Sequence, residues 1–361
     1  MSDGRIYNFS AGPSMMPLPV LEKAAAQMLN YEGSGMSVME MSHRSKYYDD
    51  IINGAQDVLR RVLNIPDNYK ILFMQGGATM QFSAIPLNLM VTGKADYAIT
   101  GNFARNAAKE ARKFGTVQIA ATSEADNFTW IPTQDQLNLD PTADYFYFCA
   151  NNTIFGTEWH YDPETGNVPL VADMSSNILS KPVDVSKYGL IYAGAQKNMG
   201  PAGMAVVIIR EDLMGHYREN MPVLLDFALT ADKNSMYNTP PTYTIYMMKL
   251  VAEWVEQMGG VEAMAMLADK RSSMLYEFLD SSELFKGAAQ KASRSRMNVT
   301  FRTGDDELDK KFIKESIEAG MTNLKGHRLV GGMRASIYNA MPVEGVEYLI
   351  DFMQKFEKNN K

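Results

Sequence analysis

Cysteine is nearly absent from this chain of 361 residues, which contains a single one, Cys149. An internal disulfide is thereby excluded, and so low a cysteine content fits a reducing cytoplasm, which is the location we predict. Long apolar runs are absent too, and the first residues lack the charged-then-apolar pattern of a secretory signal. The formal net charge is −7, so the basic excess typical of nucleic-acid binding is missing. We therefore expect neither nucleic acid nor a membrane as a partner, and we predict no metal site.

Hydrophobic residues make up 46% of the chain, which is enough for a large core and two domains. Strand-like apolar runs alternate with helical patterns over residues 70–210, which predicts an α/β fold with a mostly parallel sheet between helices. The expected strands lie at 70–74, 97–100, 117–122, 145–149, 169–173, 190–193 and 204–209. Helices are expected at 17–29, 51–63, from about 80, and at 101–114 and 242–257.

A pair of glycines, Gly259-Gly260, follows the long helix expected over 242–257, and we place a domain boundary there. The large domain is then expected over 16–258, and a smaller α+β domain over 1–15 together with 259–361. Within the small domain we expect helices at 261–279, 307–319 and from 343, and strands at 297–301 and 333–337.

One lysine, Lys197, stands alone among small residues and glycines between two expected strands. A lysine in such a place is a candidate for a lowered pKa and for Schiff-base chemistry. The alternative is a lysine whose stem covers apolar surface while its ammonium reaches water.

An aspartate, Asp173, ends the strand that precedes the Lys197 strand. Ligands of open α/β sheets bind at the carboxyl ends of the strands, so the two side chains are expected at one edge. An aspartate and a lysine are the pair that pyridoxal phosphate needs, for its pyridinium nitrogen and its aldehyde. Asp173 could instead cap a helix, and the two interpretations do not exclude each other. Phe103 and Thr153 also follow strand ends, and we expect all four residues to gather at that edge.

The segment Gln75-Gly76-Gly77-Ala78-Thr79 joins a strand to a helix. Free backbone N–H groups and the helix dipole make such a turn a ready anion site, although a turn that serves only packing is the alternative. The sequence there is neither a P-loop nor a dinucleotide fingerprint.

Two of the four histidines are followed by arginine, as His43-Arg44 and His327-Arg328, and Arg334 lies shortly after the second pair. Arginine suits bidentate binding of carboxylate and phosphate, so these residues indicate a site for an anionic substrate. Each pair could equally be an ordinary surface dipeptide. The single cysteine lies in an expected strand, which favours a buried structural thiol over a nucleophile.

These motifs together resemble the phosphoserine aminotransferases, which are class V aminotransferases of PLP fold type I, and the resemblance runs nearly end to end. It is carried by Asn8-Phe9-Ser10-Ala11-Gly12-Pro13, Ser42-His43-Arg44-Ser45, Gln75-Gly76-Gly77-Ala78-Thr79, Ala172-Asp173-Met174-Ser175-Ser176, Gly194-Ala195-Gln196-Lys197-Asn198, Tyr237-Asn238-Thr239-Pro240-Pro241-Thr242, Gly326-His327-Arg328 and Gly331-Gly332-Met333-Arg334-Ala335-Ser336. The resemblance implies a large domain with a mostly parallel seven-stranded sheet, a smaller α+β domain, and pyridoxal 5'-phosphate as cofactor.

The resemblance also implies roles for single residues. Lys197 would hold the aldehyde and move the proton, Asp173 would keep the pyridine nitrogen protonated, and Thr153 would bind the phenolic oxygen. Phe103 would stack on the ring, at a position where the family usually has tryptophan, so stacking is kept but the indole donor is lost. The cofactor phosphate would be bound by Gly77, Ala78 and Gln196, and by Asn238 and Thr239 of the second subunit of a homodimer with shared active sites. Arg334 would bind the substrate α-carboxylate, and the substrate phosphate would be bound by His43, Arg44, His327 and Arg328.

The implied reaction exchanges amino groups between L-glutamate and 3-phosphohydroxypyruvate, giving O-phospho-L-serine and 2-oxoglutarate. The resemblance leaves open the related phosphorylated threonine precursor of vitamin B6 synthesis. An alanine–glyoxylate type of transaminase is an alternative, but its substrate lacks the phosphate that the two His-Arg pairs would bind. A cysteine desulfurase is disfavoured because Cys149 lies on a strand, and a PLP-binding protein without turnover is disfavoured by Lys197 and Asp173.

Overall fold

The computed structural model describes residues 4–216 and 221–360. Residues 1–3 and 361, at the ends of the expected small domain, and residues 217–220 of the expected large domain lie outside the described residues.

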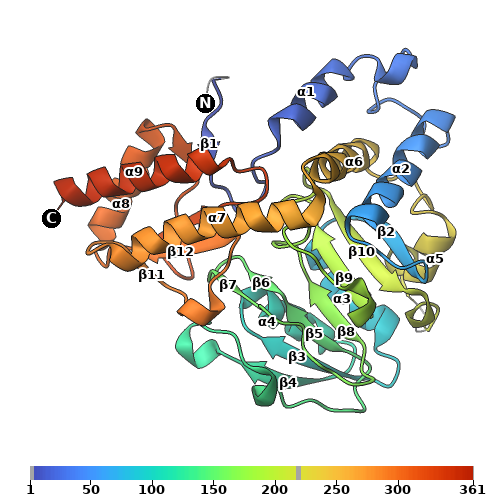
Figure 1. Cartoon of the computed structure of the whole chain (residues 1–361). Helices are drawn as coiled ribbons and strands as arrows, with labels where there is room; N and C mark the ends of the chain where they lie inside the picture. Colours follow the sequence, from blue (N-terminus) through green and yellow to red (C-terminus); the bar gives the residue numbers. More distant parts are fainter. Residues whose placement is uncertain (1–3, 217–220, 361) are drawn as a thin grey trace.

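A seven-stranded sheet forms the centre of the larger part of the molecule (Figure 1), with strand order β2-β10-β9-β8-β5-β3-β4. The strands are β2 (Tyr69–Gln75), β3 (Lys94–Ile99), β4 (Thr116–Thr122), β5 (Phe146–Cys149), β8 (Leu170–Asp173), β9 (Leu190–Gly194) and β10 (Met204–Arg210). Strand β10 runs antiparallel to both of its neighbours, and the other pairs are parallel. The expected α/β fold with a mostly parallel sheet is therefore confirmed.

Alternate residues of each strand face opposite sides of the sheet, and helices cover both sides. Phe146 and Phe148 of β5 pack in a cluster with α2 (Lys46–Val62) and α6 (Thr242–Gln257). Their neighbour Tyr147 packs on the other face with α3 (Ala78–Leu89) and α4 (Asn102–Ala111). Since both faces are covered by helices, every residue of the central strands β5, β8 and β9 is buried, as is typical of parallel sheets. The rest of this part comprises α1 (Leu18–Ala26), α5 (Phe227–Asp232) and the short hairpin β6–β7 (Asn151–Asn152, Thr157–Glu158).

The smaller part has its own apolar cluster, built from the chain's two ends. Its helices are α7 (Gly260–Ser281), α8 (Asp306–Glu318) and α9 (Val343–Asn359), and its three-stranded sheet has the order β11 (Lys286–Gly287), β12 (Asn298–Arg302), β14 (Met333–Ser336). Near the N-terminus, β1 (Tyr7–Asn8) pairs in parallel with β13 (Met321–Thr322). The N-terminal segment therefore lies beside the C-terminal helices, as Figure 1 shows.

Helix α7 belongs to both parts, because Val261 and Met264 lie in the cluster around the sheet while Leu275 and Leu279 lie in the cluster of the smaller part. In Figure 1 it runs from beside α6 to the smaller part. A division at 258/259 thus stays a prediction, and the packing itself changes within α7.

Several element ends differ from those expected. Helix α2 begins at Lys46 rather than 51, since the Ser45 side chain accepts a hydrogen bond from Tyr48 N and caps the helix. Helix α1 ends at Ala26 rather than 29, and α4 ends at Ala111 rather than 114. After α1 the chain makes a hydrogen bond from Met28 N to Ala25 O, three residues back instead of four, and this bond closes the last turn.

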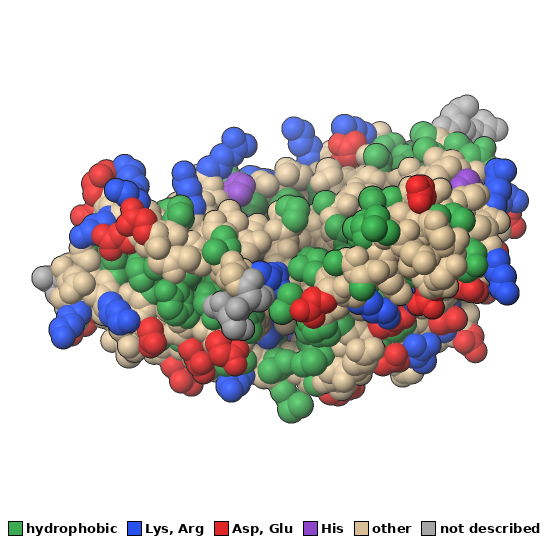
Figure 2. All heavy atoms as spheres, turned by 90° about the horizontal axis from the view of Figure 1, so that it is seen from above, with side chains coloured by type: hydrophobic (Ala, Val, Ile, Leu, Met, Phe, Trp, Pro, Cys, Tyr) green, Lys and Arg blue, Asp and Glu red, His purple; other side chains and the backbone are tan. Residues whose placement is uncertain are grey.

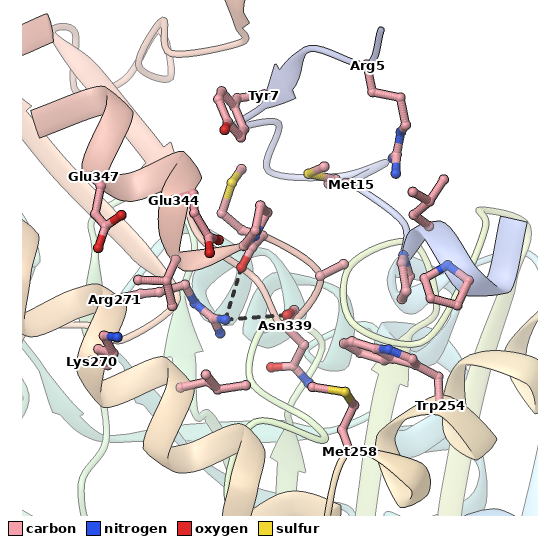
Figure 3. A pocket seen from close by; sticks show the side chains of 18 residues that line it. Arg5, Tyr7, Met15, Trp254, Met258, Lys270, Arg271, Asn339, Glu344 and Glu347 are labelled. Carbon is pink, nitrogen blue, oxygen red and sulfur yellow. Dashed lines mark hydrogen bonds between the residues drawn. The ribbon is translucent and has the colours of Figure 1, made fainter. Parts of the chain in front are cut away.

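A cavity of about 660 Å³ lies where the two parts meet (Figure 3). Arg271 of α7 is 1% exposed in its wall, and its Nη1 donates to the carbonyls of Met341 (3.0 Å) and Asn339 (3.4 Å). These bonds fasten α7 to the chain segment that leads into α9. Trp254 of α6 and Met15 line the opposite side, and Lys197 is not among the lining residues.

On the face drawn in Figure 2, lysine and arginine side chains lie interspersed with aspartate and glutamate. A search of the described helices finds none with the length and apolarity needed to cross a membrane.

Candidate active site

Lys197 lies in the turn between β9 and β10, and its ammonium points at two of the residues expected beside it. Nζ donates a hydrogen bond of 2.8 Å to Thr153 Oγ1 and lies 5.6 Å from the centroid of the Phe103 ring. Burial lowers the pKa of the Lys197 ammonium below its ordinary value, the positive charge of Arg334 acts in the same direction, and the Asp173 carboxylate opposes them. A lysine whose pKa is lowered releases its proton more readily than an exposed lysine, and the neutral amine can act as a base or nucleophile.

Asp173 is the last residue of β8 and is 4% exposed. Its Oδ2 accepts a hydrogen bond of 2.9 Å from the Tyr192 hydroxyl, and its Oδ1 accepts one of 2.9 Å from Ser175 N. Residues 175–179 form turns, so Asp173 does not cap a helix, and the helix-cap interpretation is wrong. A buried carboxylate whose two donors, the Tyr192 hydroxyl and Ser175 N, are both neutral is suited to meet a cationic group of a ligand.

Thr153 follows β6 and links the lysine to a buried polar network. Its Oγ1 accepts from Lys197 and donates to Ser176 Oγ at 3.0 Å, and Ser176 Oγ donates in turn to the Asn151 carbonyl at 2.8 Å. Because Thr153 is 4% exposed and Ser176 2% exposed, this network fixes the direction of the Lys197 side chain.

The glycine turn before α3 is open towards a ligand. Gly77 is the N-cap of α3, and among the described residues no side chain accepts a hydrogen bond from the first N–H groups of the helix at this position. A Cβ atom added to Gly77 would meet no atom within 4 Å. A Cβ added to Gly194, at the end of β9, would lie 2.8 Å from Gln196 Oε1 and 3.3 Å from Ala78 Cβ. Gly194 therefore allows Gln196 and the first residue of α3 to approach each other, and the amide groups there form an anion site with the helix dipole.

Arg334 of β14 brings the smaller part of the molecule to the same place. Its Nη1 donates to the Thr153 carbonyl at 3.3 Å, and its Nε is buried without a hydrogen-bond partner among the described residues. Burial lowers the pKa of this guanidinium, which nevertheless stays charged in proteins. A half-buried cation with a spare buried donor is a natural partner for a carboxylate.

His327 lies next to Arg334 and Arg328. Burial lowers the pKa of His327, and the positive charges of Arg334 and then Arg328 lower it further. Its Nδ1 accepts a hydrogen bond of 3.2 Å from Leu329 N, and the Arg328 side chain is exposed. These residues extend the positive field around Arg334 outwards to the surface.

Within the described residues, no hydrogen bond or ion pair joins the other four expected site residues to Lys197, Asp173 or Arg334. Arg44 is exposed, and in the described ranges no hydrogen bond or ion pair joins it or His43 to the second His-Arg pair. Asn238 Oδ1 and the Thr239 carbonyl accept from Gln75 Nε2, at 2.7 and 3.1 Å, on an exposed loop.

Sequence reasoning missed Tyr192, Ser176 and Tyr338. Tyr192 lies opposite Asp173 in the β8–β9 register, and Tyr338 donates a hydrogen bond of 2.9 Å to the Ala11 carbonyl while accepting one from Asn298. The apolar run of β9 indicated that Tyr192 is buried, but only the register of the parallel pair could show which residue it meets.

Over residues 6–349 the sequence matches the family model described as aminotransferase class-V. The chain belongs to the class V aminotransferases. It is 53% identical over 358 residues to a phosphoserine aminotransferase of Bacillus cereus, an alignment that covers 99% of each chain.

Solved structures agree with this assignment to the class V aminotransferases. A phosphoserine aminotransferase from Bacillus circulans subsp. alkalophilus has a TM-score of 0.97 at 46% identity, with 99% of each chain covered. A PLP-bound phosphoserine aminotransferase from Trichomonas vaginalis has a TM-score of 0.93 at 41% identity, covering 97% of this chain and 100% of the other. The fold expected from the resemblance is therefore confirmed.

Proposed function

We propose that this chain transfers the amino group of L-glutamate to 3-phosphohydroxypyruvate, giving O-phospho-L-serine and 2-oxoglutarate, with pyridoxal 5'-phosphate as cofactor. The observation that carries the proposal is the cluster in which Lys197 contacts Thr153 and Phe103 near the carboxylate of Asp173. These are the groups that the cofactor's aldehyde, phenolic oxygen, ring face and ring nitrogen require.

The cofactor also needs a site for its phosphate, and the open N-terminus of α3 is suited to bind it. Gly77 leaves free space there, and Ala78 and Gln196 border it. The residues present thus fit the cofactor from end to end. When bound, the cofactor supplies an electron-withdrawing ring that makes the proton on the substrate α-carbon removable.

Lys197 is the group that moves this proton. Its lowered pKa favours proton release, and the neutral Nζ could accept a proton from the substrate α-carbon and return it at C4′, the aldehyde carbon of the cofactor. The bond to Thr153 Oγ1 orients Nζ before the transfer, and Phe103 shields one side of the site from water.

Arg334 binds the α-carboxylate that glutamate and the keto acid share, because its spare buried donors require an anion. His327 and Arg328 lie further out and bind the substrate phosphate. We place His43, Arg44, Asn238 and Thr239 in the site of a second subunit, since within the described part of one chain no hydrogen bond joins them to Lys197. The protein is then a homodimer with shared sites, and its single cysteine is consistent with the cytoplasm. The same cations would accept the phosphorylated threonine precursor of vitamin B6.

A cysteine desulfurase activity is not supported. Cys149 lies in β5 and is 3% exposed, and burial raises the pKa of its thiol well above the ordinary value. A thiol in that state is a poor nucleophile. The alanine–glyoxylate type of transaminase remains the alternative, and the substrate phosphate distinguishes it.

The first prediction concerns this phosphate. Arg44→Ala and Arg328→Ala should each lower kcat/KM for phosphohydroxypyruvate by about tenfold to a hundredfold, because each removes a charge-assisted hydrogen bond to the phosphate dianion. Activity on hydroxypyruvate, which lacks the phosphate, should change much less. The measurement is the ratio of the two kcat/KM values in the wild type and in each variant.

Arg112→Ala is the matched control, because Arg112 is exposed at the end of α4 and its removal changes the net charge equally. It should leave the ratio unchanged. An unchanged ratio in both Arg44→Ala and Arg328→Ala would remove the main physical support for the phosphorylated substrate.

A second prediction concerns assembly. Lys197→Ala and Thr239→Asp chains, each inactive alone, should regain activity when they are mixed and allowed to exchange subunits. If Thr239 completes the partner's site, each hybrid dimer contains one intact site, so about one quarter of wild-type activity is expected from random assortment.

The control mixture combines Lys197→Ala with Asp173→Asn chains, whose hybrid dimer contains no intact site, and it should stay inactive. Hybrid dimers that form but show no activity in the Lys197→Ala and Thr239→Asp mixture would contradict a shared site.

A further inference from the structure

A row of buried tyrosines lies behind Asp173 within the sheet. The Tyr192 hydroxyl lies 2.9 Å from Asp173 Oδ2, and the Tyr147 hydroxyl lies 2.8 Å from that of Tyr192. Tyr192 is 0% and Tyr147 1% exposed. Neither ring borders Lys197, and the function proposed above does not use either hydroxyl.

The direction of these hydrogen bonds follows because each tyrosine hydroxyl has one proton to donate and the carboxylate has none. The ionised Asp173 carboxylate can only accept, so the single hydroxyl proton of Tyr192 points at Oδ2. Tyr147 must then donate to the Tyr192 oxygen. Burial raises the pKa values of both phenols well above the ordinary value, and the charge of Asp173 raises them further, so both stay protonated donors. The two bonds polarise each other, and both strengthen the contact at Oδ2.

The register of the sheet fixes this arrangement. Asp173 of β8 is the partner of Tyr192 of β9 and of Cys149 of β5, and Tyr147 lies two residues before Cys149 on the same face. Tyr97 of β3 stacks on Tyr147, with ring centroids 4.7 Å apart. The hydroxyls are thus held by three packed strands rather than by a mobile loop.

Asp173 is consequently held at both oxygens, since Ser175 N donates to Oδ1 at 2.9 Å. Each donor fixes the direction of one carboxylate oxygen, and removing one donor leaves the carboxylate free to turn away from the ring nitrogen. This matters only because Asp173 faces a protonated nitrogen, so the inference rests on the function proposed above.

We propose that Tyr192, backed by Tyr147, is a positioning residue for Asp173: the phenol fixes the direction of the carboxylate, so that the carboxylate meets the protonated ring nitrogen of the cofactor. The phenol touches neither substrate nor cofactor and acts through the carboxylate alone. Its removal should therefore change the protonation of the ring nitrogen and kcat, and leave KM for glutamate nearly unchanged.

The test uses holoenzyme loaded with pyridoxal phosphate that carries ¹⁵N in the ring, without substrate. The ¹⁵N chemical shift reports where the proton lies. In Tyr192→Phe we expect the shift to move towards that of an unprotonated pyridine and kcat to fall about tenfold to a hundredfold, as for the loss of one hydrogen bond to a charged group. Tyr147→Phe should change the ¹⁵N shift and kcat in the same direction, but by a smaller amount.

Tyr145→Phe is the matched control. Its hydroxyl is as buried as that of Tyr192 and bonds to another tyrosine, Tyr97, at 2.7 Å, but it does not reach Asp173. It should leave the ¹⁵N shift and kcat as in the wild type, even if the melting temperature falls.

Two results would overturn the inference: a wild-type ¹⁵N shift in both Tyr192→Phe and Tyr147→Phe, or an equal change in Tyr145→Phe, which would indicate general repacking. Tyr147→Phe decides the matter if Tyr192→Phe does not fold. The Asp173→Asn variant distinguishes a failure of the Tyr192 role from a failure of the proposed function. If Asp173→Asn also keeps the wild-type ¹⁵N shift, Asp173 does not meet the ring nitrogen at all.

Discussion

Lys197→Ala should lower the rate of amino transfer by about a thousandfold or more, while the protein still binds pyridoxal phosphate. General acid–base catalysis by one positioned side chain contributes roughly a hundredfold to ten-thousandfold, and Lys197 would act in every proton transfer. Cofactor affinity should survive because Thr153, Asp173 and the α3 N-terminus are unchanged. The measurements are kcat with saturating substrates and the cofactor dissociation constant from absorbance.

Borohydride reduction of the wild type should attach the cofactor to Lys197, as mass spectrometry of the digested protein can show. Lys109→Ala, a change at an exposed lysine of α4, should leave kcat and labelling unchanged. Methylamine is a base small enough to take the place of the missing lysine amine, and it should restore part of the activity of Lys197→Ala. A label on another lysine would show that the whole site is wrongly placed.

Asp173→Asn should lower kcat by about a hundredfold or more and weaken cofactor binding far less. A neutral amide has nearly the shape of the carboxylate, and its single oxygen can keep one of the two contacts, to Tyr192 or to Ser175 N. It cannot stabilise the positive charge on the ring nitrogen, and a lost preorganised charge at a reacting group costs roughly a hundredfold to a thousandfold.

Asp162→Asn provides the control for this change. Asp162 also accepts a hydrogen bond from a tyrosine, Tyr188, at 2.5 Å, but it lies at the surface, on a segment that does not contribute to the cluster around Lys197. Its kcat should equal that of the wild type. Turnover of Asp173→Asn within a few-fold of wild type would rule out the proposed role of Asp173.

Strand and turn positions around the site could be predicted from local patterns. The apolar runs before Asp173 and around Lys197 became β8, β9 and β10, because a short apolar run bounded by glycine turns is a local signal of a buried strand. Helix ends were less predictable, since a cap such as Ser45 competes with the apolar pattern that marks the helix interior.

The antiparallel direction of β10 could not be predicted from its sequence. Its apolar residues would suit either direction, and the direction follows from the short connection after β9, which leaves no room for a crossover helix.

The sequence by itself determined the family, the mostly parallel sheet and the residues Lys197 and Asp173 at its edge, because these depend on spacing along the chain. Only the tertiary structure decided that Arg334 of the smaller part meets Thr153, and that Tyr192 meets Asp173. The first contact depends on how α7 docks the two parts, and the second on the register of two parallel strands joined by a long crossover. The packing of the whole core determines both contacts, and no local sequence pattern predicts them.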